Sequence, residues 1–474
     1  MYIYFSDMKL STEAVQLKKF NLPSIRFRNN NLTSFAGIVV FQALFRKLNL
    51  YERLVGCFRH LQSSAIYRPD RIFLILILHV ALGFRRLREL AYYKDDPMVL
   101  RTVALKKMPD VSTITRSIRQ FDPLAFTSTQ TLSKEIVLDR LKASDFARLT
   151  VDFDGSVIWT KSRSTEGTAI GYNTKKRGAR GYYPLFATVA QTGQVLDLLH
   201  RPGNIHDTEG AAEFIRHTFN QLALLLPKTK LEARFDSAHF NQTTCFWLDK
   251  NKIDFSITVA FRTLSELKNL VENRKRWRPI DESWSYFEII WKPKCWPAPM
   301  RFIFYRQIRA VPRQGPIQLD LFYPVDHSFD YKVVVTNKRT SAKNVLHFHN
   351  GRGSQEGIFA ELKSQAQMGY LPTRRLMANQ MFTLAAVFAH NLYRELHMNA
   401  FVSCRATSLT RPARWIFTQA QTLRHTLIQR AGFLHKPSGK LSLTLSANPA
   451  VADNIQHYLR RLLPPNDYEN LMQR

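Results

Sequence analysis

Cysteine is scarce in this chain of 474 residues, and acidic residues are outnumbered by basic ones. The four cysteines, Cys57, Cys245, Cys295 and Cys404, are far apart and form no Cys-x-x-Cys pair. This spacing disfavours a cysteine zinc ribbon and a disulfide scaffold, and it fits a reducing compartment. Asp and Glu total 37 against 68 Lys and Arg, which leaves a formal net charge of +31. So large an excess indicates a polyanionic partner, with nucleic acid as the first candidate and an anionic membrane surface as the second.

Long hydrophobic runs, secretion signals and internal repeats are also missing. The most apolar run, residues 72–84, is shorter than the roughly 20 residues that a membrane-spanning helix needs, and it contains His79. It is therefore predicted to be a buried core helix. Residues 1–10 lack a basic segment followed by an apolar one, so we expect no secretory signal. Basic residues are spread along the chain and are not clustered beside an anchor, which argues against a membrane partner.

Apolar residues are plentiful, because 45% of the chain is hydrophobic and 12% is aromatic. Between residues 35 and 138 they recur every three to four positions, which predicts helices. Within this region a turn precedes a short basic helix, one face of which carries Ser112, Thr115, Arg116 and Arg119. Such a helix is typical of helix-turn-helix DNA-binding proteins, and also of an ordinary surface helix, so both interpretations stay open.

The pattern changes at Arg148, where alternating apolar residues predict strands. Strands are expected at residues 149–159, 185–190, 195–199, 231–235 and 254–261, and helices at residues 207–225 and 241–250. Residues 265–330 are rich in Trp, Pro and Arg and are predicted to form a β-rich insertion. A strand at 331–337, helices at 355–367 and 377–398, and a strand at 441–445 are expected to follow. The order of strands and helices predicts an α/β protein with a mixed sheet.

Acidic residues at the ends of apolar strands are conspicuous in so basic a chain. Asp152 and Asp154 lie two apart on the first strand and therefore face the same side. Asp236 ends the fourth strand, and Glu356 lies near the start of a later helix. Sites in open α/β sheets form at the carboxyl ends of strands, and several carboxylates there would suit Mg²⁺ and phosphodiester chemistry. Taken singly, each acid is better explained as a turn cap or a salt-bridge partner. The order of an Asp on the first strand, an Asp on the fourth and a Glu on a later helix is much more specific than any single acid.

The helix around Glu356 carries further charged residues at regular spacing. Arg352 and Glu356 are four residues apart and Lys363 is seven further on, so the three can share one helix face. This arrangement fits metal coordination beside phosphate binding, and it equally fits a plain ladder of ion pairs.

Together these residues resemble the DDE transposases of bacterial insertion sequences, the RNase H-like cut-and-paste class. The third motif of that class reads Tyr-x2-Arg-x3-Glu-x6-Lys, and here His349, Arg352, Glu356 and Lys363 stand at that spacing, with His in place of Tyr. The resemblance covers residues 110–400 and is greatest to the insertion sequence thirteen-eighty family. It is carried by VDFDGS, GYNTKKRGARGYYPLFA, RPGNIHDTEGAAEFI, RFDSAHF and HNGRGSQEGIFAELK.

The resemblance implies that Asp154, Asp236 and Glu356 form a catalytic, metal-binding triad. Asp154 is favoured over Asp152 because Asp-Gly-Ser resembles the family's Asp-x-Thr/Ser. Mg²⁺ is the implied cofactor, with Mn²⁺ as a substitute. The DNA-binding residues implied by the resemblance or expected from their charge are Arg352, Lys363, His349, Lys175, Lys176, Arg177, Arg180, Arg116 and Arg119. In relatives a Trp of the insertion stacks on a flipped base, which makes Trp284, Trp291 and Trp296 candidates.

His200, His206 and Asp207 match no standard metal motif and are interpreted as loop packing. The expected division of the chain is residues 1–140 as an N-terminal helical DNA-binding region, 141–264 and 331–400 as two parts of an RNase H-like catalytic core, 265–330 as the β-rich insertion, and 401–474 as a C-terminal basic region.

The resemblance implies a transposase that binds the terminal inverted repeats of its element, cleaves the ends and transfers them to target DNA. Its partners would be double-stranded DNA and a second copy of the chain on paired ends. We expect a cytoplasmic, nucleoid-associated bacterial protein. A domesticated, non-catalytic DNA-binding regulator and a metal-dependent nuclease without strand transfer are the alternatives.

Overall fold

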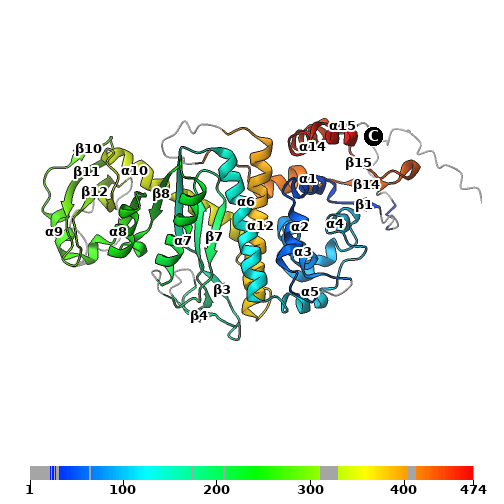
Figure 1. The fold of residues 1–474 in the computed structure, drawn as a ribbon, viewed down its shortest axis with the longest axis horizontal. Coiled ribbons are helices and arrows are strands. Elements are labelled where there is room, and N and C mark those ends of the chain that lie inside the picture. Colours follow the sequence, from blue (N-terminus) through cyan, green and yellow to red (C-terminus); the bar gives the residue numbers. More distant parts are fainter. Residues whose placement is uncertain are drawn as a thin grey trace, which may run out of the picture.

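The computed structural model describes residues 31–62, 66–171, 176–205, 209–309, 329–403 and 413–472, together with Leu22, Ser24, Ile25 and Phe27. The molecule is elongated (Figure 1). A large sheet occupies one side, a group of helices occupies the other, and the long helices α6 (Pro123–Ser144) and α12 (Leu376–Ala400) lie between them. The mixed α/β fold expected from the sequence is confirmed.

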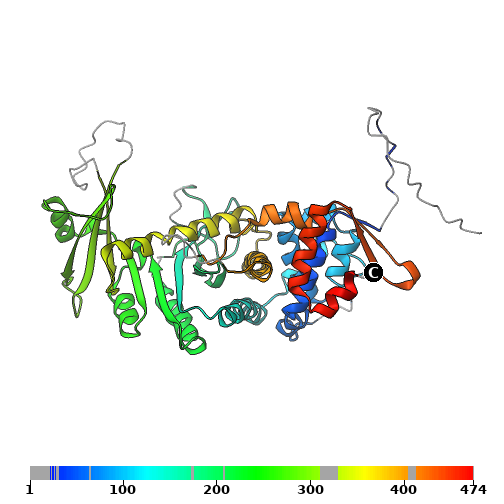
Figure 2. The same cartoon turned by 90° about the horizontal axis from the view of Figure 1, so that it is seen from above.

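The main sheet has nine strands in the order β10-β11-β12-β13-β9-β8-β2-β6-β7. Its bounds are β2 Arg148–Gly155, β6 Leu185–Val189, β7 Val195–Leu199, β8 Lys230–Phe235, β9 Asp254–Val259, β10 Arg278–Pro279, β11 Trp284–Trp291, β12 Met300–Ile308 and β13 Phe329–Thr336. Strands β2, β8 and β9 run parallel, and the other pairings are antiparallel. The central strands are buried along most of their length because helices cover both faces of the sheet (Figure 2).

The predicted insertion is β-rich, and its strands extend the central sheet. Strand β13 pairs antiparallel with β9, from Val333 opposite Val259 to Thr336 opposite Ser256. Strand β12 pairs antiparallel with β13, and β11 pairs antiparallel with β12, so the sheet continues outward. Helix α9 (Ser265–Glu272) precedes these strands in the chain. The two smaller sheets are β3-β5-β4 (Ile158–Thr160, Arg180–Tyr182 and Ala169–Ile170) and β1-β14-β15 (Leu32–Thr33, Gly432–His435 and Ser442–Leu445).

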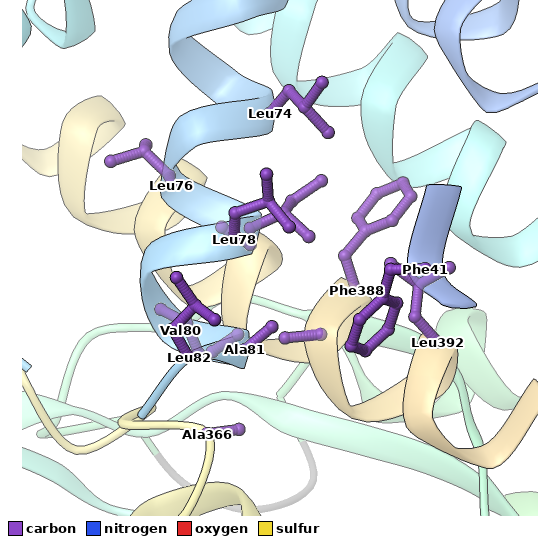
Figure 3. Packing of buried hydrophobic residues seen from close by; sticks show 14 of the residues in the cluster. Phe41, Leu74, Leu76, Leu78, Val80, Ala81, Leu82, Ala366, Phe388 and Leu392 are labelled. Atoms are coloured by element: carbon purple, nitrogen blue, oxygen red, sulfur yellow. The ribbon is translucent and has the colours of Figure 1, made fainter. Parts of the chain in front are cut away.

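The helical side begins with α1 (Val39–Lys47), α2 (Leu50–Cys57), α3 (Pro69–Ala81), α4 (Pro97–Thr102) and α5 (Val111–Ile118). The apolar run at residues 72–84 contains most of α3, whose residues from Ile72 to Ala81 are all buried, as predicted. Figure 3 shows Leu78 of α3 near Phe388 of α12, and Phe41 of α1 near Leu392. The rings of Phe73 and Phe388 meet edge to face at 5.7 Å, so α3 packs directly against α12.

Local sequence explains where several helices start. Helices α4 and α6 and the C-terminal helix α14 (Pro449–Leu462) each begin with Pro directly after Asp96, Asp122 or Asn448. In each case the Asp or Asn side chain accepts a hydrogen bond from a backbone N–H of the first turn. The side chain caps the helix and the proline fixes the first helical φ, so the sequence determines these starts locally.

The C-terminal region returns to the N-terminal helices, which the division at residue 401 did not predict. Strand β14 pairs with β1, and α14 packs against α1 (Figure 1). The backbone N–H of Ala36 donates to the carbonyl of Arg430 at 2.8 Å. A Cβ added to Gly37 would lie 1.7 Å from the carbonyl oxygen of Leu427. Within the part of the chain that the structure describes, no helix combines the length and the apolar composition that crossing a membrane requires.

The close approach at Gly37 leads to a first prediction. Gly37→Ala should lower the free energy of unfolding by about 2–3 kcal/mol, because the new methyl group overlaps backbone that cannot move like a side chain. Gly56→Ala is the matched control, since Gly56 lies in α2 with nothing within 4 Å of the added Cβ. The control should gain about 0.5–1 kcal/mol from a stiffer unfolded chain. Urea unfolding followed by circular dichroism measures both, and equal stability of the two variants would contradict the close packing.

Candidate active site

Two of the predicted acids meet at the carboxyl ends of adjacent strands. Strands β2 and β8 run parallel, with Phe153 opposite Phe235, and Asp154 and Asp236 are the next residues along. The two phenyl rings stack at 5.1 Å and fix this register. Burial, together with the charge of Asp236, raises the pKa of Asp154 to about 6. Carboxylates that disfavour each other's charge are suited to binding a cation between them.

Helix α11 (Gly353–Ser364) brings a cation and a third acid to this edge of the sheet. Nη1 of Arg352, at the start of α11, lies 3.1 Å from Oδ2 of Asp154 and opposes the rise in its pKa. The amide of Gln355 donates to the backbone carbonyl of Asp152 at 3.1 Å and holds the first turn of α11 against β2. Glu356 is exposed in that same turn, one turn after Arg352.

The predicted triad is thus only partly assembled. Asp154 and Asp236 interact, whereas Glu356 lies on the helix that contacts Asp154. Among the described residues, no three His, Cys, Asp or Glu side chains are close enough to hold a metal ion. Asp236 also caps the short helix that follows β8, because its carboxylate accepts from the N–H of Ala238 at 3.1 Å.

Asp152 belongs to a different structure, a buried ion pair. Its carboxylate accepts from Nε and Nη2 of Arg234 at 2.6 and 2.7 Å, and both side chains are almost fully buried. Arg234 also donates to the carbonyl of Phe348 at 3.0 Å, in helix α10 (Ala342–Asn350). Asp152 is thus engaged by Arg234, and the preference for Asp154 over Asp152 as the site residue stays a prediction. The role of Arg234 was missed, although a basic residue in the middle of an apolar strand is a signal that it needs a buried partner.

His349 does not lie where a phosphate contact was expected. It is 3% exposed, and its two ring nitrogens lie 2.9 Å from the hydroxyls of Ser256 and Thr258 on β9. Burial, with nearby Lys332 and Arg352, holds its pKa well below the usual value, so the ring is neutral. His349 packs α10 against the sheet, which excludes the expected DNA contact in this conformation.

The remaining expected DNA contacts fall into three groups. Arg116, Arg119, Arg177 and Lys363 are exposed. Lys176 lies over the ring of Trp159 in β3 at 5.5 Å, and Arg180 in β5 is half-buried and bonded to Thr168, so both are held by neighbours in or beside the small sheet β3-β5-β4. Lys175 lies outside the described residues.

The tryptophans of the insertion pack mainly against neighbouring side chains. Trp296 is buried against Phe240 and Phe246, which removes it as a base-stacking candidate. Trp291 donates to Glu266 at 3.2 Å, and Trp284 meets Tyr305 edge to face.

His200 lies against Tyr182, with ring centroids 4.5 Å apart, and burial lowers its pKa to about 4. This placement agrees with the interpretation of His200 as loop packing. His206 and Asp207 lie outside the described residues.

The buried ion pair predicts a large stability effect. Asp152→Asn should lower the free energy of unfolding by about 3–5 kcal/mol, because it leaves the guanidinium of Arg234 buried beside a neutral amide. The control is Asp330→Asn, which breaks the pair of Asp330 with Arg309; the Asp330 side chain is 64% exposed, so about 1 kcal/mol or less is expected. Urea unfolding compares the two, and similar losses would show that the Asp152–Arg234 pair is not specially required.

For Asp154 we predict the opposite effect, a gain in the free energy of unfolding when its charge is removed. Folding raises its pKa from 3.8 to about 6, so its ionised form costs stability above pH 6 and costs nothing below pH 3.8. Asp154→Asn should therefore raise the free energy of unfolding at pH 8 by up to about 3 kcal/mol in chelator-treated buffer. The gain should shrink as the pH falls through 6 and vanish near 3.8. A gain that is independent of pH would refute this cause.

Comparison with known proteins gives results at the level of the family and of solved structures. The family model described as "Transposase DDE domain group 1" matches residues 18–466. Curated proteins give no significant match. The chain is similar to the piggyBac transposase solved by cryo-EM as a synaptic complex with hairpin DNA, with a TM-score of 0.41 and 11% identity over 90% of this chain and 85% of that one. It is also similar to the Mos1 transposase in a paired-end complex with the left transposon end, with a TM-score of 0.18 and 12% identity over 41% of this chain and 60% of that one. Because the family model spans nearly the whole sequence, the chain belongs to the family of transposases with a DDE domain.

Proposed function

We propose that this chain is the transposase of an insertion sequence of the thirteen-eighty family, which binds the terminal inverted repeats, cleaves the ends and joins them to target DNA. One observation supports the proposal above the others. Asp154 and Asp236 meet at the carboxyl ends of β2 and β8, and the helix that carries Glu356 reaches the same point through Arg352. The strand order β7-β6-β2-β8-β9, antiparallel on one side of β2 and parallel on the other, supports an RNase H-like core.

The donor set fits a divalent cation. Asp154 and Asp236 offer hard oxygen ligands. Burial, and then the nearby charge of Asp236, raises the pKa of Asp154, and a bound cation would offset both effects. We propose that these two acids and Glu356 hold Mg²⁺, with Mn²⁺ as a substitute. When bound, the ion supplies an activated water and stabilises the leaving oxygen of a phosphodiester.

The chain's own residues would position the DNA. Arg352, now paired with Asp154, carries a planar guanidinium that can turn to a phosphate oxygen beside the scissile bond once Asp154 is engaged elsewhere. Lys363, exposed in the last turn of α11, extends the basic face of the helix. Phosphoryl transfer of this kind depends on positioning and charge stabilisation, so no covalent protein nucleophile is required.

The proposed partners follow from the reaction. A segment excised from DNA has two ends, so we propose that two copies of the chain act on paired ends of double-stranded DNA. The net charge of +31 supports such a polyanionic partner.

The proposal is tested by excision in cells of a marked DNA segment bounded by the repeats that flank the gene. Glu356→Gln should abolish excision, because it removes one of the carboxylates proposed to hold the metal. Glu213→Gln is the matched control, since Glu213 is an exposed glutamate on helix α7 (Ala211–Leu225), and it should leave excision unchanged.

Three other outcomes would count against specific parts of the proposal. Equal excision by the intact protein and Glu356→Gln would refute the triad. Cleaved ends without joined products would favour a metal-dependent nuclease. Binding of the ends without any cleavage by the intact protein would favour a domesticated regulator.

A further inference from the structure

An open groove of about 900 Å³ lies between the N-terminal helices and the sheet. Thr115 and Arg119, in and directly after α5, line one wall. The other wall comes from two segments of the sheet side, residues 160–166 at the end of β3 and after it, and residues 371–375 between α11 and α12. In Figure 1, α5, β3 and β4 lie along the same lower edge of the molecule.

The groove is basic. Arg119, Arg374 and Arg375 line it, and all three are exposed. Among the described residues of its lining, Glu166 is the one acid, and its carboxylate accepts from the backbone N–H of Leu376 at 3.1 Å, at the start of α12. The N–H of Glu166 also donates to the carbonyl of Arg374 at 2.9 Å. The negative charge is thus held at a helix N-terminus, where it is partly offset, and the guanidiniums dominate the groove.

Hydroxyl groups complete the lining. Thr160, Ser162 and Ser164 contribute hydroxyls that can donate hydrogen bonds. The hydroxyls of Thr115 and Thr373 also line the groove, but they already donate to the carbonyls of Val111 at 2.8 Å and Arg375 at 3.3 Å. Arginine guanidiniums mixed with Ser and Thr hydroxyls are the groups that most often contact the phosphates of DNA. An exposed guanidinium holds a single small anion weakly, whereas several of them along a polyanion release counterions and act together.

The groove is connected to the candidate active site through the chain. One of its segments starts at the end of the short strand β3, which follows β2, the strand that carries Asp154 as its last residue but one. The other follows α11, which carries Glu356. A ligand in the groove would therefore touch both segments that leave the site, and also the separate helical side of the molecule.

We propose that this groove binds the phosphate backbone of duplex DNA and holds it between helix α5 and the two segments at residues 160–166 and 371–375. The inference rests on the proposed function for the identity of the DNA. It adds the place where the duplex lies and the three arginines that hold it. Arg374 and Arg375 were not among the residues expected from the sequence.

The test uses the full chain carrying Arg119→Gln, Arg374→Gln and Arg375→Gln together. The control carries Arg216→Gln, Lys228→Gln and Lys250→Gln, three exposed cations outside the groove lining, and it loses the same charge. Fluorescence anisotropy measures the Kd for a duplex with one element end and for an unrelated duplex, over a series of salt concentrations. The thermal midpoint of each protein confirms that it is folded.

The groove variant should bind both duplexes at least about tenfold more weakly at 0.15 M salt, by the same factor, because phosphate contacts carry no sequence information. The slope of log Kd against log salt should fall by about 0.9 for each phosphate that the variant no longer binds, and the control should keep the slope of the intact protein. If groove variant and control behave alike, the groove inference fails and the proposed function stands. If the intact protein binds neither duplex, both fail. If inorganic phosphate stabilises the intact protein but not the groove variant while DNA binding is equal, the groove is a small-anion site and the inference is overturned.

Discussion

The ion pair of Asp152 and Arg234 at the centre of the sheet is the interaction on which the site depends. It links neighbouring strands β2 and β8, and through the carbonyl of Phe348 it also holds α10 against them. The backbone carbonyl of Asp152 accepts a hydrogen bond from the side-chain amide of Gln355, and this bond fixes the first turn of α11. A buried pair of this kind contributes little net stability, but it is costly to break, so it acts chiefly to enforce one arrangement. The positions of Asp154, Asp236 and Arg352 depend on this ion pair, because they lie on or next to the elements that it holds together.

Helix α12 links the two sides of the molecule through ion pairs of its own. Glu395 pairs with Arg140 of α6 at 2.6 Å and accepts from Gln194, close to β7. Arg394 pairs with Glu361 of α11 at 2.5 Å. One helix therefore relates the position of α11 to that of α6, while its apolar residues pack against α3. The helical side and the edge of the sheet that carries Asp154 are held in one fixed relation.

Much of the sheet and part of the site could be predicted from the sequence, because the relevant signals are local. Alternation located the strands at whose ends Asp154 and Asp236 lie, within β2 and directly after β8, and parallel neighbours place such ends together. Features that depend on distant segments could not be predicted. The burial of His349 depends on Ser256 and Thr258, nearly a hundred residues away. The packing of the C-terminal region on α1 joins segments at opposite ends of the chain, which no spacing within either segment reveals.

The pairing of β1 with β14 has a consequence for synthesis of the protein. A ribosome completes the strands from β2 to β13 well before it reaches Gly432, so the central sheet has all its partners while the chain is still growing. The N-terminal helices emerge first but lack β14 and α14 until the last residues are made. The helical side is therefore the last part to be finished, and a chain that terminates early carries a complete sheet beside an open helical core.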